Sequence, residues 1–119
     1  MGIESYQNVI FIILTIVGVT FLLISVFLMK YPPKEINGFY GYRTSRSMQT
    51  IEAWDFSQRY SSKIMIVIGV LYTLFGISSL FMPKLDDMIS AFISIAVVLG
   101  GVFVMFYMTE KQLAKRFDD

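Results

Sequence analysis

The 119-residue chain contains no cysteine, no histidine, only three prolines and one tryptophan. Without cysteine there is neither a disulfide nor thiol chemistry, and without histidine the commonest metal ligand is missing. The sequence also lacks a phosphate-cradling glycine loop, a Gly-x-Ser-x-Gly elbow and a His-Glu-x-x-His motif. These absences argue against metalloenzymes, thiol enzymes and nucleotide-binding proteins, and we expect no metal and no cofactor.

Charge is missing altogether from three long apolar stretches, residues 9–29, 64–82 and 88–108. A helix of about 20 residues rises about 1.5 Å per residue and so crosses a hydrocarbon core of about 30 Å. The composition agrees, with 55% hydrophobic and 16% charged residues and a mean hydropathy of +0.64. The helices of a soluble core would need amphipathic partners, which this sequence lacks. We therefore predict an all-α integral membrane protein, a single domain with three transmembrane helices.

The first apolar stretch is expected to remain in the protein as a membrane span. No Lys or Arg precedes it, and it ends at Met29-Lys30-Tyr31-Pro32-Pro33 without the small residues of a signal-peptide cleavage site. The two prolines should end this first helix.

Positive charge is distributed unevenly between the two sides of such a protein. Six of the ten Lys and Arg residues lie in segment 30–63 and three in the tail 109–119, whereas the turn 83–87 has only Lys84. The positive-inside rule then places segment 30–63 and the tail in the cytoplasm, and the N-terminus and the turn outside. Because no Asp, Glu, Lys or Arg lies inside a span, a pump or coupled transporter is not expected.

Segment 30–63 is predicted to hold a turn and then an amphipathic helix on the cytoplasmic face. Ser45 or Ser47 is the expected N-cap of this helix, which runs through residues 48–63. No Pro or Gly separates it from the second span before Gly69. Its charges form one narrow stripe at helical spacing. The stripe consists of Glu52, Asp55, Arg59 and Lys63. Acidic residues interleave the bases of the segment, so a nucleic-acid site is not expected.

Small residues recur at helical spacing in every span and predict close helix packing. They are Thr15, Gly18 and Ser25, then Gly69, Thr73 and Gly76, and finally Ser90, Ser94, Ala96 and Gly100. Packing within one bundle is the simplest interpretation, and an oligomer formed through these faces is the alternative.

Four aromatic residues and one arginine cluster near the membrane boundary of segment 30–63. They are Phe39, Tyr40, Tyr42, Trp54 and Arg43. One interpretation is anchoring in membrane lipids, with rings at headgroup depth and the guanidinium on phosphate. The other is a recognition surface built from rigid rings and a forked donor. Two glycines within four residues indicate a specific turn, which simple anchoring does not require.

The same segment resembles the SdpI family of bacterial membrane proteins, in its short, three-span form. The resemblance rests on residues 37–44, which read Asn-Gly-Phe-Tyr-Gly-Tyr-Arg-Thr, followed by Ser47, Trp54 and Gln58, with one span before and two after. It implies a protein of the bacterial inner membrane that gives immunity to the secreted peptide toxin of the sporulation-delay system. The functional positions that it implies are Asn37, Gly41, Tyr42, Arg43, Thr44, Ser47, Trp54 and Gln58. The longer form of the family also holds a transcriptional repressor at the membrane, using spans that this chain lacks.

Three hypotheses of function follow. The first is a non-enzymatic protein that binds a membrane-active peptide toxin or shields its target. The second is a scaffold or signalling protein that docks a cytosolic regulator through segment 30–63. The third is a membrane-embedded enzyme acting on lipid or a hydrophobic peptide through Arg43, Glu52 and Asp55.

Overall fold

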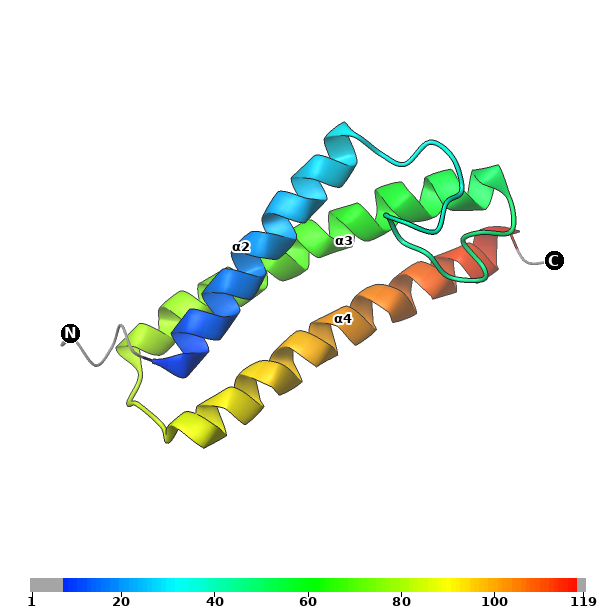
Figure 1. The fold of residues 1–119 in the computed structure, drawn as a ribbon. Coiled ribbons are helices and arrows are strands. Elements are labelled where there is room, and N and C mark those ends of the chain that lie inside the picture. Colours follow the sequence, from blue (N-terminus) through cyan, green and yellow to red (C-terminus); the bar gives the residue numbers. More distant parts are fainter. Residues whose placement is uncertain (1–7, 118–119) are drawn as a thin grey trace.

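The computed structural model describes residues 8–117 and contains three long helices over that range (Figure 1). Helix α2 spans Val9–Lys30, α3 spans Ile51–Ser78 and continues into the short 3₁₀ helix η1 at Ser79–Phe81, and α4 spans Asp87–Phe117. No strand occurs within the described range. All three helices are long and apolar enough to cross a membrane. The prediction of an all-α membrane protein with three spans is therefore confirmed.

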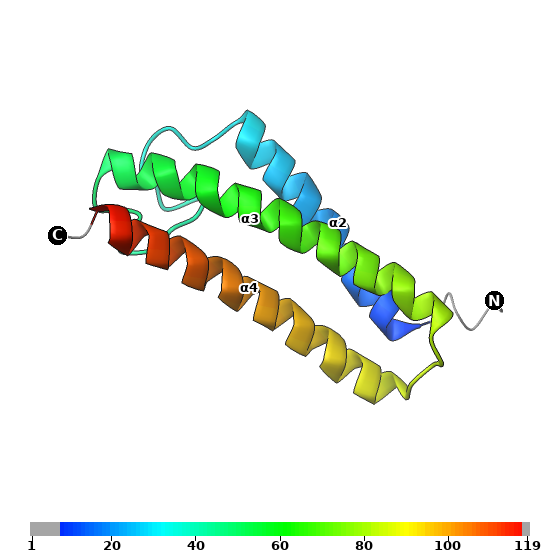
Figure 2. The ribbon, with the colours of Figure 1, turned by 180° about the vertical axis from the view of Figure 1, so that it is seen from behind.

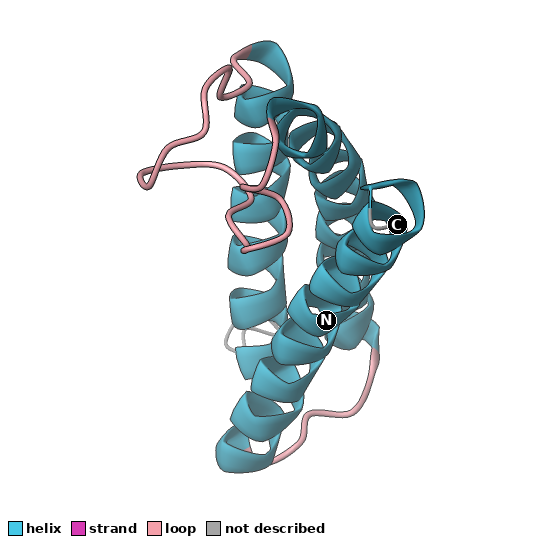
Figure 3. Cartoon of the chain, turned by 90° about the vertical axis from the view of Figure 1, so that its right-hand side faces the viewer, coloured by secondary structure: helices cyan, strands magenta, loops and turns pink. Residues whose placement is uncertain are grey.

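The helices form a bundle, and the two connections between them lie at opposite ends of it. Helix α2 crosses α3, and α4 runs beside α3 (Figures 1 and 2). The long connection 31–50 and the end of α4 lie at one end, and the short connection 82–86 and the start of α2 lie at the other (Figure 3). This arrangement gathers the basic segments at one end of the bundle, as three membrane crossings require. We call it the loop end.

Helix α3 begins later than predicted and joins the amphipathic segment to the second span. Its N-cap is Thr50, whose hydroxyl accepts a hydrogen bond from the backbone N–H of Ala53 at 3.0 Å. The predicted N-cap, Ser45 or Ser47, was wrong, because the hydroxyl of Ser47 is used inside the preceding turn. The four residues of the charged stripe all lie on the exposed side of α3. That part of the prediction is confirmed.

Helices α3 and α4 are both longer than a membrane requires. At about 1.5 Å per residue, the 31 residues of α4 extend for about 46 Å, against a hydrocarbon core of about 30 Å. The extra length lies at the loop end, where Leu113 is fully buried and packs in one cluster with Ala53 and Tyr42. Tail residues 109–117, for which the sequence predicts no particular structure, continue the third span as helix.

Small residues bring α2 and α3 into close contact, as predicted for packing within one bundle. A side-chain carbon added at Gly69 would lie 2.9 Å from the backbone oxygen of Gly18, and one added at Gly76 would lie 2.7 Å from the hydroxyl of Thr15. Without side chains at the two glycines of α3, the backbones can approach and gain dispersion contacts, which drive helix association in lipid. Gly100 takes no part in this packing, since nothing in the described chain comes within 4 Å of an added carbon there.

Helices α3 and α4 are joined inside the membrane by the side chain of Tyr72. Its hydroxyl donates to the backbone carbonyl of Val98 at 2.7 Å. Gly101 makes room for the ring, because an added side-chain carbon there would overlap the Tyr72 hydroxyl. A polar group without access to water needs such a partner. No pattern in the sequence predicts this contact.

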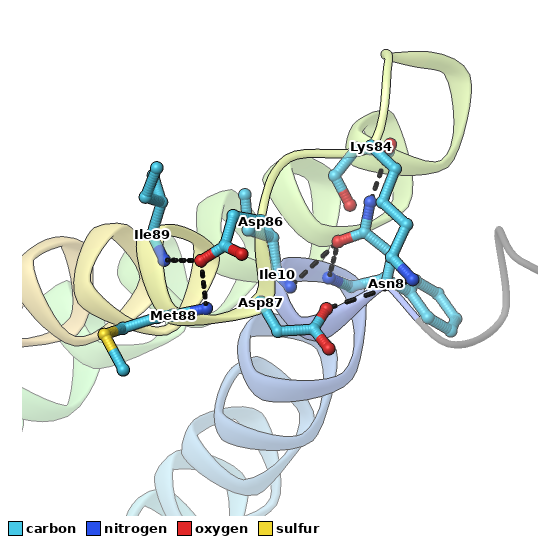
Figure 4. Close-up of polar contacts among 9 residues, drawn as sticks. Asn8, Ile10, Lys84, Asp86, Asp87, Met88 and Ile89 are labelled. Atoms are coloured by element: carbon cyan, nitrogen blue, oxygen red, sulfur yellow. Dashed lines mark hydrogen bonds and ion pairs between the residues drawn. The ribbon is translucent and has the colours of Figure 1, made fainter.

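Polar side chains also fasten the opposite end of the bundle (Figure 4). The Asn8 carbonyl oxygen accepts from the N–H of Ile10 at 2.9 Å, and its amide donates to the backbone oxygen of Ser79 at 3.3 Å. Asp86 accepts from the N–H of Met88 at 3.0 Å. These contacts cap α2 and α4 and hold the start of α2 against the end of α3.

Candidate functional site

Trp54 ties the beginning of the connection 31–50 to the first turns of α3. The side chain is fully buried, and its indole N–H donates to the backbone oxygen of Pro33 at 2.7 Å. Proline cannot donate a backbone hydrogen bond but can still accept one, and a buried indole requires an acceptor. The only tryptophan of the chain therefore acts as a support beneath the loop, since its ring does not reach the surface.

Gln58, one turn further along α3, holds the middle of the same loop. Its side-chain oxygen accepts from the N–H of Tyr42 at 2.7 Å, and its side-chain nitrogen donates to the carbonyl of Tyr42 at 2.8 Å. A side-chain amide has the donor and the acceptor to pair with both backbone groups of one residue. The loop is thereby fixed to α3 without a regular strand.

Gly41 is required at its position for two separate reasons. Its φ of 101° lies in a region that residues with a side-chain carbon rarely adopt. An added carbon would also lie 2.5 Å from the side-chain oxygen of Gln58 and 2.8 Å from the ring of Pro33. Gly41 thus allows the loop to lie directly on the side chains that hold it.

Thr44 and Ser47 close the turn that leads into α3. The Ser47 hydroxyl accepts from the N–H of Thr44 at 2.8 Å, and the Thr44 hydroxyl accepts from the N–H of Ser47 at 3.2 Å. The Ser47 hydroxyl lies near two carbonyl oxygens, those of Thr44 at 3.0 Å and of Tyr42 at 3.3 Å. Ser47 is fully buried, so these contacts replace water as its hydrogen-bonding partners.

Asn37 and Arg43 shape the outer part of the loop. The Asn37 side-chain oxygen accepts from the N–H groups of Phe39 at 2.8 Å and Tyr40 at 2.9 Å. Arg43 donates to the carbonyl of Gly38, while its side chain remains exposed. The resulting tip presents Phe39, which is 91% exposed, beside the exposed Tyr40 and Arg43.

Tyr42 connects the loop to α4. Its ring is 6% exposed and lies 5.2 Å from the ring of Phe106. Burial, together with the nearby carboxylate of Glu110, raises the pKa of the Tyr42 hydroxyl well above its ordinary value. Glu110 also forms an ion pair with Arg46 at 3.7 Å, a second link between the loop and α4.

A groove of about 530 Å³ lies beneath the loop, between the last turns of α2 and the facing sides of α3 and α4. The residues that line it are Leu23, Ile24, Phe27, Leu28, Tyr40, Gly41, Tyr42, Arg43, Ser61, Met65, Met105 and Phe106. Among these described residues, Arg43 is the one charged side chain. The groove is therefore apolar along its length and positively charged where the loop covers it.

The structure brings together most of the site residues that the sequence predicted, but in three different positions. Gly41, Trp54 and Gln58 meet around Pro33 and hold the loop, with Thr44 and Ser47 closing its second turn. Tyr42 and Arg43 line the groove, and Asn37 shapes the exposed tip. Glu52 and Asp55 lie on the exposed stripe of α3 and do not line the groove with Arg43.

Sequence reasoning missed the parts of the site that come from the spans and from Pro33. The residues of α2 and α4 that line the groove are ordinary apolar residues, and nothing in their spacing distinguishes them from residues that face lipid. Pro33 was recognised only as the end of a helix. Its carbonyl accepts from a tryptophan 21 residues further along the chain, and no local pattern in the sequence indicates such a contact.

The sequence of the chain matches a known protein family. The family model of the SdpI/YfhL protein family matches residues 34–109, well over half of the chain. The chain belongs to the SdpI/YfhL family. It is also 36% identical over 102 residues to the uncharacterized protein YfhL of Bacillus subtilis (strain 168), an alignment that covers 82% of this chain and 84% of YfhL. No solved structure matches the chain.

The part that matches the SdpI/YfhL family contains every predicted site residue. It begins at Lys34, within the long connection, and continues through α3 and most of α4. The resemblance noted from residues 37–58 is thus confirmed as family membership. The roles of the individual residues remain predictions.

Proposed function

We propose that this protein is a non-enzymatic membrane protein that protects a bacterium from a secreted, membrane-active peptide toxin. The observation that carries the proposal is its membership of the SdpI/YfhL family, whose matched region, residues 34–109, includes most of the connection 31–50 and all of α3. The toxin-immunity role comes from the resemblance of residues 37–58 to SdpI-type proteins.

In the proposed orientation, the loop end faces the cytoplasm. Six of the ten Lys and Arg residues lie in segment 30–63 and three in residues 109–119, all near this end. Basic residues in short segments next to spans are retained on the cytoplasmic side. The short connection 82–86, with Lys84 paired to Asp87 at 3.9 Å, then lies outside (Figure 4).

The toxin-contacting surface in this proposal is the tip of the loop. Phe39 and Tyr40 supply exposed rings, and Arg43 supplies a forked donor that suits a carboxylate or a backbone carbonyl. Trp54 and Gln58 hold this tip in place from beneath and need not touch the toxin. Bound toxin would be kept from inserting or assembling, or its target in the membrane would be shielded.

The test is survival of cells exposed to secreted antimicrobial peptides. Cells lacking the gene and cells overexpressing it would be exposed in parallel to a panel of such peptides. We expect the gene to change survival against one peptide, or one narrow group, and to leave the others unaffected. An unchanged survival curve across the panel, which includes the sporulation-delay peptide, contradicts the proposal.

A second candidate function is docking of a cytosolic regulator. It is favoured by the exposed charged stripe of Glu52, Asp55, Arg59 and Lys63, on a part of α3 that extends beyond the apolar span. Charge reversal by Glu52→Lys together with Asp55→Lys should release such a partner from detergent extracts without lowering the amount of membrane protein. If no cytosolic protein is recovered with the wild type, this candidate is rejected.

A further inference from the structure

The groove beneath the loop opens among residues that belong to a membrane span. Four of its lining residues come from the last two turns of α2, and three of them, Leu23, Ile24 and Phe27, are exposed. Around a transmembrane helix, exposed apolar side chains are in contact with lipid acyl chains. On the side formed by α2, the groove is therefore open to lipid.

The end of the groove that the loop covers is positively charged, because Arg43 lies there. Its guanidinium carries five N–H donors, and the structure uses a donor of Nη1 for the carbonyl of Gly38. Donors remain for a second acceptor, and no acidic side chain is among the groove's described lining residues. An arginine fork matches the oxygens of a phosphate. The loop follows directly after Lys30, at the end of α2, where the phosphates of a bilayer lie.

We propose that this groove binds one acyl chain of an anionic phospholipid, with the lipid phosphate held by Arg43. The apolar part of the groove suits the acyl chain of such a lipid, and the positive charge at the end that the loop covers suits its phosphate. A volume of about 530 Å³ is in the range of small-molecule sites, which hold molecules of about 300–1,000 Å³. The inference does not rest on the toxin-immunity proposal, because lipid binding is measured without any toxin.

The experiment is photo-crosslinking in phosphatidylcholine nanodiscs that contain a small fraction of phosphatidylglycerol with a photoactivatable group on one acyl chain. We expect adducts on the groove residues Leu23, Ile24, Phe27, Leu28, Met105 and Phe106. Unlabelled phosphatidylglycerol should compete better than unlabelled phosphatidylcholine. Arg43→Gln should lower the adduct yield about fivefold, the effect of one basic residue near a lipid surface. Arg43→Lys, which keeps the charge, should retain most of the yield.

Two matched controls separate the groove from the general lipid surface. Lys34→Gln removes an exposed charge from the same loop outside the groove and should leave the yield unchanged. Ile24→Trp fills the groove and should lower the yield, whereas Val26→Trp, on an exposed part of α2 outside the groove, should not. Ile24→Trp keeps the proposal testable if Arg43→Gln does not fold.

Three results would overturn the proposal. The first is equal competition by the two unlabelled lipids, and the second is a yield that neither Arg43→Gln nor Ile24→Trp changes. The third is a groove without adducts in a protein that runs as a dimer, which would show that a second copy of the chain covers this face.

Discussion

Gly41, Tyr42 and Gln58 show how single residues fix the loop that carries the candidate site. The loop lies on α3 through the backbone of Tyr42, which pairs with both polar atoms of the Gln58 side chain. Gly41 permits this contact through its positive φ and its lack of a side chain. A substitution at one of these positions should therefore affect the loop before it affects the spans.

Gly41→Ala should destabilise the folded protein by about 1–3 kcal/mol, because the added carbon meets Gln58 and Pro33 in a strained backbone conformation. Gly38→Ala is the control, since nothing lies within 4 Å of an added carbon there. The measurement is the unfolding of both purified variants in detergent micelles. Equal stability of the two variants would show that the loop does not hold the described contact.

Tyr42→Phe should change how stability depends on pH. The folded protein raises the pKa of the Tyr42 hydroxyl above the value of about 10 that it has in the unfolded chain, so the fold binds this proton more tightly. That contribution is complete below pH 10 and is lost as the pH rises beyond it. Melting temperatures of wild type and Tyr42→Phe should differ by a constant amount at pH 7–9, and above pH 10 the wild type should lose stability relative to the variant. Parallel curves up to pH 11 would contradict the assignment.

At the scale of the helices, the sequence predicted what depends on length and apolar content. The three spans could be predicted because a membrane requires long uncharged helices. The charged stripe on α3 could be predicted because its residues recur at helical spacing. The start of α3 could not be predicted in the same way, because Ser45, Ser47 and Thr50 are all suitable N-caps and only the three-dimensional turn decides which hydroxyl is used. The extension of α4 to Phe117 depends on contacts with α3, such as that between Phe117 and Phe56 with ring centroids 6.0 Å apart. Contacts between distant segments leave no local pattern.

Gly69→Val should separate α2 from α3. The new side chain would meet the backbone of Gly18 and the side chain of Leu22, at a cost of about 1–3 kcal/mol for overpacking. Gly100→Val is the matched control, because its position in α4 is open. Resistance to unfolding by a denaturing detergent should fall for the first variant only. A similar loss for Gly100→Val would place a further helix, such as that of a second copy, against α4.

For the whole molecule, the chain places both long helical extensions and the loop at one end of the bundle, and the positive charge is concentrated there (Figure 1). The match to the SdpI/YfhL family covers most of the loop, all of α3 and most of α4. The residues that a family resemblance singled out divide, in the structure, into those that hold the loop and those that reach a surface. That division could not be read from the sequence, because Trp54 and Phe39 are both aromatic and only one is buried.

The orientation can be tested with single cysteines, because the natural chain has none. Ser45→Cys in the loop and Leu85→Cys in the short connection both replace exposed residues. An impermeant maleimide should label Leu85→Cys in intact cells and Ser45→Cys only after lysis. Labelling in the opposite order would place the loop end outside the cell.

The most direct test of the proposed toxin immunity is whether Arg43 is required for protection. Cells expressing wild type, Arg43→Ala or the loop control Lys34→Ala at equal membrane abundance would be exposed to the peptide against which the wild type protects. We predict that Lys34→Ala protects as well as the wild type, whereas Arg43→Ala loses most or all of the protection. Full protection by Arg43→Ala would contradict a role for the loop end in toxin immunity.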